Sequence, residues 1–184
     1  TDKVTIDFRK KLKLISFVGK LNSAKGYDIF GKTIIKILDK YKDWKSVVIG
    51  DERREKLFFK HKNLLIKGYT KHKNVLNLLK KVSISVVSSR WQEPFGRTSL
   101  EAASRGSAVI ISNRGGLPET AKDAIILKDL SSKELFNQIE KLILNKKKLI
   151  KTQKNNYKNF IFNHTFISKL IDRLREGISN KKTF

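Results

Sequence analysis

The 184-residue sequence contains no cysteine and no long apolar run. Without cysteine there is neither a disulfide framework nor a thiolate metal site, which fits a reducing compartment. No segment approaches the roughly 20 consecutive apolar residues that cross a bilayer. The first residues, TDKVTIDFRKK, lack the apolar core of a signal peptide, so secretion is not supported. We therefore expect a cytoplasmic protein.

Acidic residues are scarce, since 17 Asp and Glu stand against 41 Lys and Arg, for a net charge of +24. This charge predicts attraction to nucleotide phosphates, nucleic acid or a membrane surface. The lysines are spread along the chain, as a lysine-rich proteome would also produce. No nucleic-acid-binding motif is recognisable, so we expect no nucleic acid partner. Peripheral contact with the inner face of the membrane is retained as an expectation.

Short apolar runs alternate with helical patterns. Strands are predicted at 14–19, 46–50, 63–69, 83–89, 107–113 and 124–128. Helices are predicted at 28–41, 73–82, 97–106 and 131–144, with a short helical turn at 117–121. This alternation favours an α/β fold: a doubly wound, Rossmann-like parallel sheet of about six strands with flanking helices. Such sheets bind ligands at the carboxyl ends of their strands.

The predicted helices have apolar faces. In helix 28–41 that face holds Phe30, Ile34, Ile37, Leu38 and Tyr41. Helix 131–144 opens with a capping box, Ser131 and Glu134, and is expected to bury Leu135, Ile139, Leu142 and Ile143. A last helix is expected to bury Ile167, Leu170, Ile171, Leu174 and Ile178. We expect one domain over 1–184, with a core at about 13–145 and C-terminal helices at 146–184.

The stretch from Val18 to Thr33 holds two overlapping phosphate patterns. Read from Gly26, it formally matches the P-loop of ATP and GTP hydrolases, with Lys32 on the phosphate. The preceding strand, however, ends near Gly19, and residues 27–30 already begin an amphipathic helix that turns Lys32 to solvent. We interpret the P-loop match as coincidental. A P-loop nucleoside triphosphatase remains the second hypothesis, and a non-catalytic basic module that binds nucleic acid or anionic membrane the third.

The other pattern is GKLNSAKG at the carboxyl end of the first strand. Gly19 lets the backbone approach a ligand closely. Lys20 and Lys25 flank the loop, and the helix that begins near Gly26 offers free N–H groups to an anion. Two lysine charges can neutralise a diphosphate leaving group.

A second constellation, SSRWQEPFGRTSLEAASRG, follows the fourth strand at 88–106. Pro94 and Gly96 shape a tight turn into the next helix. The first N–H groups of that helix are unpaired and suit a phosphate. These groups belong to Phe95, Gly96, Arg97 and Thr98.

Two glutamates bracket this turn, with seven residues between them. Glu101 lies about one helical turn inside the helix, where a carboxylate can accept two hydrogen bonds from a vicinal diol such as ribose. Glu93 lies on the loop, near where a sugar would sit beyond the phosphates. Each glutamate alone is an ordinary surface or helix-end acid, and their combination with the turn and the first loop carries the prediction.

With these motifs the chain resembles the C-terminal, nucleotide-sugar-binding half of GT-B retaining glycosyltransferases of the group 1 type, glycosyltransferase family four. The resemblance runs from about Leu14 to about Asn145. It is carried by FVGKLNSAKG, VVIGDE, LLIKGY, VVSSRWQEPFGRTSLEAASRG and VIISNRGGLPE. The two spaced glutamates with PFG, together with GGLPE, are its most specific elements.

Carried over by position, the resemblance implies that Lys20, Lys25 and Glu93 serve catalysis. The two lysines would bind the donor diphosphate, Glu93 would contact the donor sugar, and Glu101 would hold the ribose hydroxyls. The remaining donor contacts would come from Gly19, Gly50, Asp51, Gly68, Tyr69, Phe95, Gly96, Arg97 and Thr98.

The resemblance further implies transfer of a hexosyl group from a UDP-, GDP- or ADP-sugar to a hydroxyl acceptor. The basic charge is consistent with an acceptor in cell-envelope glycan or glycolipid synthesis, which we take as an expectation. It implies no cofactor and no metal, and the chain has no Asp-x-Asp and only three scattered histidines, His61, His72 and His164. Position 20 is Lys where the family usually has Arg, which keeps the charge but loses a planar fork. The acceptor-binding N-terminal half is missing, so we expect an excised domain or fragment with little activity by itself.

Overall fold

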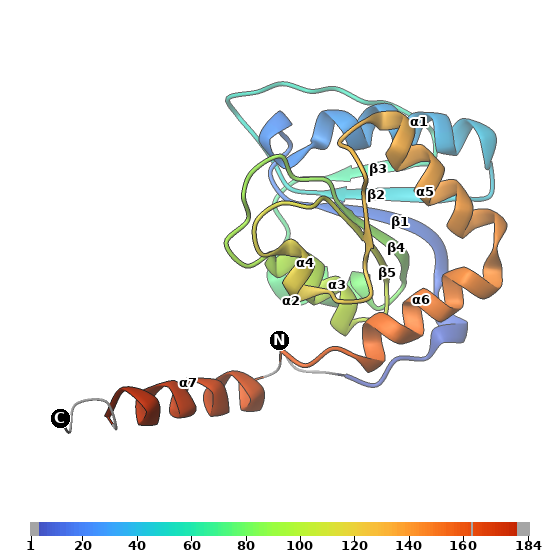
Figure 1. Cartoon of the computed structure of the whole chain (residues 1–184). Coiled ribbons are helices and arrows are strands. Elements are labelled where there is room, and N and C mark those ends of the chain that lie inside the picture. Colours follow the sequence, from blue (N-terminus) through green and yellow to red (C-terminus); the bar gives the residue numbers. More distant parts are fainter. Residues whose placement is uncertain (1–3, 163, 180–184) are drawn as a thin grey trace.

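The computed structural model describes residues 4–162 and 164–179, and its central feature is a six-stranded parallel sheet (Figure 1). The strand order is β3-β2-β1-β4-β5-β6. This is the arrangement of a doubly wound sheet, so the predicted fold class is confirmed. The strands are β1 (Leu12–Val18), β2 (Lys45–Ile49), β3 (Leu64–Lys67), β4 (Val82–Val87), β5 (Ala108–Ile111) and β6 (Ile125–Ile126).

Helices follow the strands as the sequence predicts, and short 3-10 turns precede β1 and α1. The turns are η1 (Phe8–Lys10) and η2 (Ser23–Lys25). The helices are α1 (Tyr27–Lys40), α2 (His72–Leu79), α3 (Arg97–Ser104), α4 (Leu117–Thr120), α5 (Ser132–Leu144), α6 (Lys146–Lys158) and α7 (His164–Ser179).

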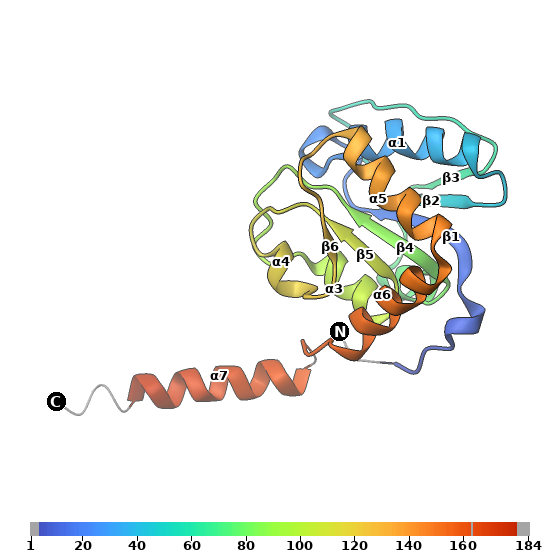
Figure 2. The same ribbon diagram turned by 45° about the vertical axis from the view of Figure 1, so that its right-hand side comes forward.

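Two apolar clusters cover the two faces of the sheet. Helices α1 and α5 lie side by side on one face, while α2, α3 and α4 cover the other (Figures 1 and 2). Strand β5 shows the alternation, since Ala108 and Ile110 belong to the first cluster and Val109 and Ile111 to the second. Strands buried on both faces are apolar throughout, which explains why the sequence shows short apolar runs instead of alternating ones.

Helix α5 begins as predicted, with one difference. The Ser131 hydroxyl accepts a hydrogen bond from the Glu134 amide at 3.1 Å. The Glu134 carboxylate does not complete the capping box; it accepts from the Lys128 amide at 3.3 Å and from Gln138 at 2.8 Å. Of the predicted apolar face, Leu135, Ile139 and Leu142 are fully buried, and Ile143 packs at the edge of the same cluster.

The predicted burial of the last helix is wrong for its central residues. Leu170, Ile171 and Leu174 are 42%, 44% and 60% exposed, and Ile167 is half-buried. The side chains of His164 and Ile178 lie outside the described residues. Helix α7 extends away from the sheet (Figures 1 and 2). An amphipathic period predicts the helix correctly, but it carries no information about whether a partner covers the apolar face.

None of the helices in the described part of the chain combines the length and apolar character that a membrane-spanning segment needs.

Candidate donor-binding cleft

A cleft lies outside the carboxyl ends of β1 and β4, where the strand order reverses and α1 and α3 leave toward opposite faces. In doubly wound sheets, ligands bind at this switch point. The cleft has a volume of about 300 Å³. Its lining residues are Phe17, Val18, Gly19, Lys25, Val87, Ser89, Glu93, Pro94, Phe95, Gly96, Arg97 and Thr98.

The structure thus brings together seven of the predicted donor-site residues. They come from two loops that are far apart in the sequence, one after β1 and one after β4. The seven are Gly19, Lys25, Glu93, Phe95, Gly96, Arg97 and Thr98.

Lys25 is placed by the 3-10 turn η2. The Asn22 side chain caps this turn by accepting a hydrogen bond from the Lys25 amide at 3.0 Å. Gly26 ends the turn with φ of 72°, and a Cβ there would lie 1.9 Å from the Ser88 carbonyl oxygen. Only glycine fits this close approach in the left-handed region. The turn is therefore pressed against the end of β4, and the Lys25 ammonium reaches the cleft.

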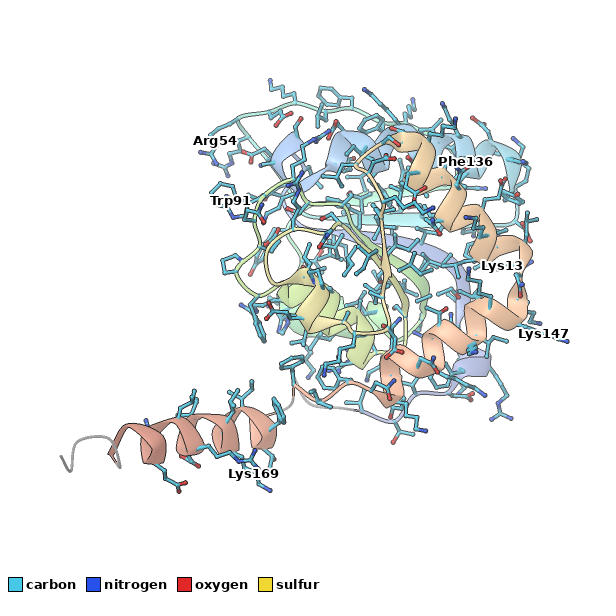
Figure 3. All side chains as sticks on the ribbon, in the orientation of Figure 1. Lys13, Arg54, Trp91, Phe136, Lys147 and Lys169 are labelled. Atoms are coloured by element: carbon cyan, nitrogen blue, oxygen red, sulfur yellow. The ribbon has the colours of Figure 1, made fainter. Side chains whose placement is uncertain are left out.

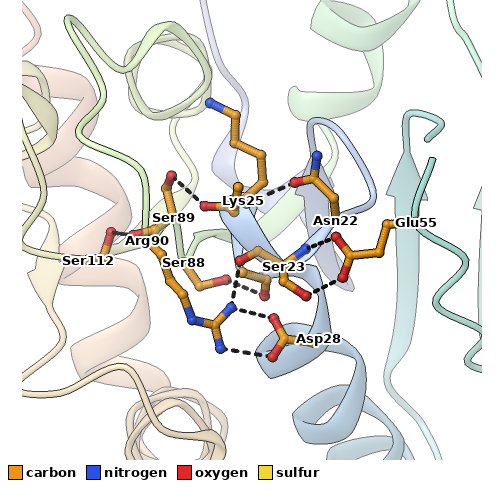
Figure 4. Close-up of polar contacts among 11 residues, drawn as sticks. Asn22, Ser23, Lys25, Asp28, Glu55, Ser88, Ser89, Arg90 and Ser112 are labelled. Atoms are coloured by element: carbon orange, nitrogen blue, oxygen red, sulfur yellow. Dashed lines mark hydrogen bonds and ion pairs between the residues drawn. The ribbon is translucent and has the colours of Figure 1, made fainter. Parts of the chain in front are cut away.

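A polar clamp fixes the same turn from outside (Figure 4). Arg90 donates from both terminal nitrogens to the Asp28 carboxylate, at 2.6 and 2.8 Å, and from one of them to the Ser23 carbonyl at 2.5 Å. These hydrogen bonds hold the pKa of Asp28 below its ordinary value. Glu55, on the loop after β2, accepts from the Ser23 amide at 2.9 Å and from the Ser23 hydroxyl. Loops after three strands therefore support the position of Lys25.

Glu93 is held by the GGLPE segment. The Gly116 amide donates to the Glu93 carbonyl at 2.7 Å, and the Gly115 amide donates to the Gln92 side chain at 2.6 Å. Gly115 has φ of 54°, and a Cβ there would lie 2.3 Å from the Glu93 carbonyl oxygen. The paired glycines are thus required by the close packing of two backbones.

The opposite wall of the cleft is the amino-terminal end of α3. Gly96 precedes the helix, and no side chain among the described residues caps it with a hydrogen bond. The first N–H groups of a helix have no partner within the helix, and they carry its positive dipole end. Arg97 and Thr98 line the cleft beside them. This end of the cleft suits an anionic group.

The other predicted site residues lie outside the lining set. Lys20 is exposed at the rim next to Gly19. Gly50 and Asp51 support the first loop, because Gly50 packs on the Gly19 backbone and the Asp51 carbonyl accepts from the Leu21 amide at 3.3 Å. Gly68 and Tyr69 follow β3, at the far side of β2, and Tyr69 is 84% exposed.

Glu101 lies one helical turn beyond Arg97 and is 6% exposed. Its Oε1 lies 2.9 Å from Nε2 of His72, the first residue of α2, and 3.8 Å from a terminal nitrogen of Arg97. No role for His72 was predicted from the sequence. Its position three residues after Tyr69, close to the predicted Gly68-Tyr69 turn, is the signal that marks it. The cleft is also lined by residues that were not predicted as site residues, because in the sequence they belong to predicted strands and were expected in the core. They are Phe17, Val18, Val87 and Ser89.

The P-loop geometry does not form. Residues 27–30 lie in the first turn of α1, and Phe30 is fully buried. A Cβ at Gly31 would lie 2.1 Å from the Phe59 ring, and the Thr33 hydroxyl donates to the Ser132 carbonyl at 3.1 Å. Lys32 is exposed on the opposite face of the helix, as its helical phase predicts. In residues 4–162 and 164–179 there is also no group of three or more His, Cys, Asp or Glu that could hold a metal ion.

Comparison with known proteins agrees with this architecture. The family model for glycosyl transferases group 1 matches residues 1–159. Spore coat protein SA of Bacillus subtilis is 29% identical over 74% of this chain, which spans 41% of that protein.

Two solved structures share the fold. The C-terminal domain of the group 1 glycosyl transferase LpcC from Francisella tularensis has a TM-score of 0.69 at 26% identity, over 79% of this chain and 82% of that one. Anabaena Alr3699/HepE in complex with UDP-glucose has a TM-score of 0.72 at 17% identity, over 92% of this chain and 49% of that one.

The fold and the position of the cleft define a doubly wound α/β protein whose ligand site lies at the switch point. Within that class the chain belongs to the group 1 glycosyl transferases, since the family match covers most of its length.

Proposed function

We propose that this chain is the donor-binding domain of a retaining glycosyltransferase, which transfers a hexosyl group from a nucleotide diphosphate sugar to a hydroxyl acceptor. The observation that carries the proposal is the pairing of Lys25 and Glu93 in a cleft that faces the amino-terminal end of α3. A cation, a carboxylate and free helix amides are the groups that a diphosphate and a sugar require. HepE, which has the same fold, was solved with UDP-glucose.

The chemistry follows from where charge develops. Departure of the nucleoside diphosphate leaves negative charge on its outer phosphate. Lys25, Lys20 at the rim and the first amides of α3 would stabilise that charge more strongly in the transition state than in the bound donor. Glu93 would contact the sugar. Retention would follow from attack on the face that the leaving group vacates, without a cofactor or a metal.

The acceptor, a cell-envelope glycan or glycolipid, would bind through an N-terminal half, and transfer would take place in the cytoplasm. The chain spans about two fifths of the length of spore coat protein SA. The isolated domain should therefore bind nucleotide and turn it over poorly.

Calorimetric titration with UDP, GDP and ADP tests the proposal and identifies the base. We expect one of the three to bind with one-to-one stoichiometry in the absence of Mg²⁺. Glu101→Ala should weaken that binding about tenfold or more, because a hydrogen bond to a charged group is lost. Unchanged affinity in this variant would remove the ribose assignment, and absence of binding by all three nucleotides would remove the proposed function.

Contact with an anionic membrane surface is part of the same proposal, and one surface supports it. A groove of about 900 Å³ lies at the amino ends of β1 and β4, opposite the cleft. We call it the basic groove; its lining includes the cations and apolar side chains of Arg9, Lys13, Leu12, Leu144, Lys146 and Lys154. It also holds one carboxylate, that of Asp43, which is paired with Lys13. Figure 3 shows Lys13 and Lys147 at the end of the molecule away from Trp91 and Arg54.

The helix beside the basic groove, α6, adds to the positive charge of this surface. Helix α6, KKKLIKTQKNNYK, contains no acidic residue. Leu12 and Leu144 are 52% and 70% exposed next to its lysines. Apolar side chains surrounded by lysines suit the interface of an anionic bilayer.

A further inference from the structure

We infer that His72 is a positioning residue that fixes the Glu101 carboxylate for the ribose hydroxyls and thereby sets the preference for ribonucleotide donors. The inference rests on the proposed function, in which Glu101 accepts from the ribose. It assigns a role to the one histidine that meets a predicted site residue among the described part of the chain.

The contact has a defined direction. Nε2 of His72 lies 2.9 Å from Oε1 of Glu101. A carboxylate oxygen only accepts, so Nε2 carries the hydrogen and donates. Within residues 4–162 and 164–179, no hydrogen bond engages Oε2 of Glu101. One oxygen is therefore held by the protein, and the other is left for a ligand.

The burial of Glu101 makes its hydrogen bond with His72 important for the orientation of the carboxylate. The Glu101 side chain is 8% exposed, whereas that of His72 is 55% exposed. A nearly buried carboxylate with one fixed oxygen presents the other in one direction, which a bidentate contact with two adjacent hydroxyls needs.

Arg97 cannot replace His72 in this role. Its terminal nitrogen lies 3.8 Å from the same Oε1, beyond hydrogen-bond distance, and its side chain is 77% exposed. Without His72 the carboxylate would be free to turn toward the Arg97 guanidinium. The aligned acceptor would then be lost even though the negative charge remained.

His72 also joins two parts of the predicted nucleotide site. It is the first residue of α2 and follows the Gly68-Tyr69 turn, which the family resemblance places beside the base. Glu101 belongs to α3, whose first residues line the cleft. The contact therefore links the loop expected at the base to the residue expected at the ribose, so a shift of one is transmitted to the other.

The test compares the affinity of the full chain for UDP, or whichever diphosphate binds best, with that for its 2′,3′-dideoxy analogue. We expect wild type to prefer the ribonucleotide by about tenfold or more. His72→Ala should reduce this ratio by about three- to tenfold without changing affinity for the dideoxy analogue, because only the hydroxyl contacts are lost. His72→Gln, which keeps a donor, should restore most of the ratio. Lys73→Ala, an exposed neighbour on α2, is the control and should match wild type.

The outcomes separate the two levels of the proposal. If Glu101→Ala leaves the ratio unchanged, the ribose assignment in the proposed function fails. If Glu101→Ala lowers the ratio and His72→Ala does not, the proposed function stands and the role of His72 is overturned. Equal loss of affinity for both nucleotides in His72→Ala would also overturn it, since that result indicates a structural role.

Discussion

The ammonium of Lys25 lies 2.5 Å from Oε1 of Glu93, and the two side chains are 29% and 15% exposed. The phosphate-binding cation and the sugar-binding carboxylate predicted from separate motifs are thus in direct contact. In the proposed function, a diphosphate that enters the cleft would take or share Lys25, which would release Glu93 toward the sugar. The ion pair would then make binding of the diphosphate and presentation of the Glu93 carboxylate to the sugar interdependent.

Removing the charge of Glu93 should therefore strengthen binding of the bare nucleotide. We expect Glu93→Gln to raise affinity for UDP, or the preferred diphosphate, by about three- to tenfold, because Lys25 no longer has a competing partner. Lys25→Ala should lower the same affinity by about tenfold or more. Calorimetry at low salt measures both. Weaker binding in Glu93→Gln would show that the pair does not compete with the phosphate.

The three lysines of the first loop and helix should differ in importance. Lys25 lines the cleft, Lys20 lies exposed at its rim, and Lys32 is exposed on the outer face of α1. Nucleotide affinity should fall most in Lys25→Ala, by only about two- to threefold in Lys20→Ala, and not at all in Lys32→Ala. Loss of binding, or of Mg²⁺-dependent hydrolysis, in Lys32→Ala would instead favour the P-loop hypothesis.

The clamp between Arg90 and Asp28 should stabilise the fold in a pH-dependent way. Its hydrogen bonds lower the pKa of Asp28 below the ordinary 3.8. The stabilisation is therefore fully present above pH 3.8 and is lost as the pH falls through the lower, folded-state value. Asp28→Asn should cost about 1 kcal/mol at pH 7, since the pair is partly exposed.

Urea unfolding of wild type and Asp28→Asn at pH 7 and at acidic pH tests this. The difference in free energy of unfolding should shrink toward zero as the solution becomes strongly acidic. A difference that is independent of pH would mean that packing, and not the ion pair, carries the effect.

Binding to anionic vesicles should depend on the first turn of α6. Replacing Lys146, Lys147 and Lys148 by Gln should weaken binding to phosphatidylglycerol-containing vesicles by about tenfold or more, because each lysine near such a surface adds about 1 kcal/mol. Replacing the exposed Lys32, Lys36 and Lys73 by Gln removes the same charge elsewhere and is the matched control. Equal losses in both variants, measured by vesicle flotation, would indicate attraction to the overall charge and not docking through the basic groove.

Much of the fold could be predicted from local patterns. The six strands were identifiable because each is a short apolar run, as in β5, where all four residues are buried. The order of the strands could not be read from the sequence, since β1 pairs with β4 across 69 to 70 positions through backbone hydrogen bonds that almost any residue can make. The exposure of the apolar face of α7 was not predicted for a similar reason. Helical spacing describes a single element, whereas burial requires a second element that packs against it.

The site was predictable where glycines and prolines mark turns. Gly26, Gly96 and Gly115 occupy positive-φ positions at the cleft, so the motifs that contain them lie where the sequence suggests. The Lys25–Glu93 contact and the His72–Glu101 contact were not predictable, because each joins side chains from distant segments. From the sequence, Lys20 and Lys25 were equal candidates for the phosphate contact. Only the direction of the loop, which places Lys25 in the cleft and Lys20 at its rim, distinguishes them.

The most direct test of the central claim is to locate the nucleotide by amide chemical-shift changes in the ¹⁵N-labelled chain. Titration with the diphosphate that binds best should produce saturable shifts at Gly19, Lys25, Gly96, Arg97 and Thr98, which line one cleft. Amides of Lys146–Lys158 should remain unchanged. Shifts confined to α6, to Gly31–Thr33 or to lysines scattered over the surface would contradict a donor site between the first loop and the amino-terminal end of α3.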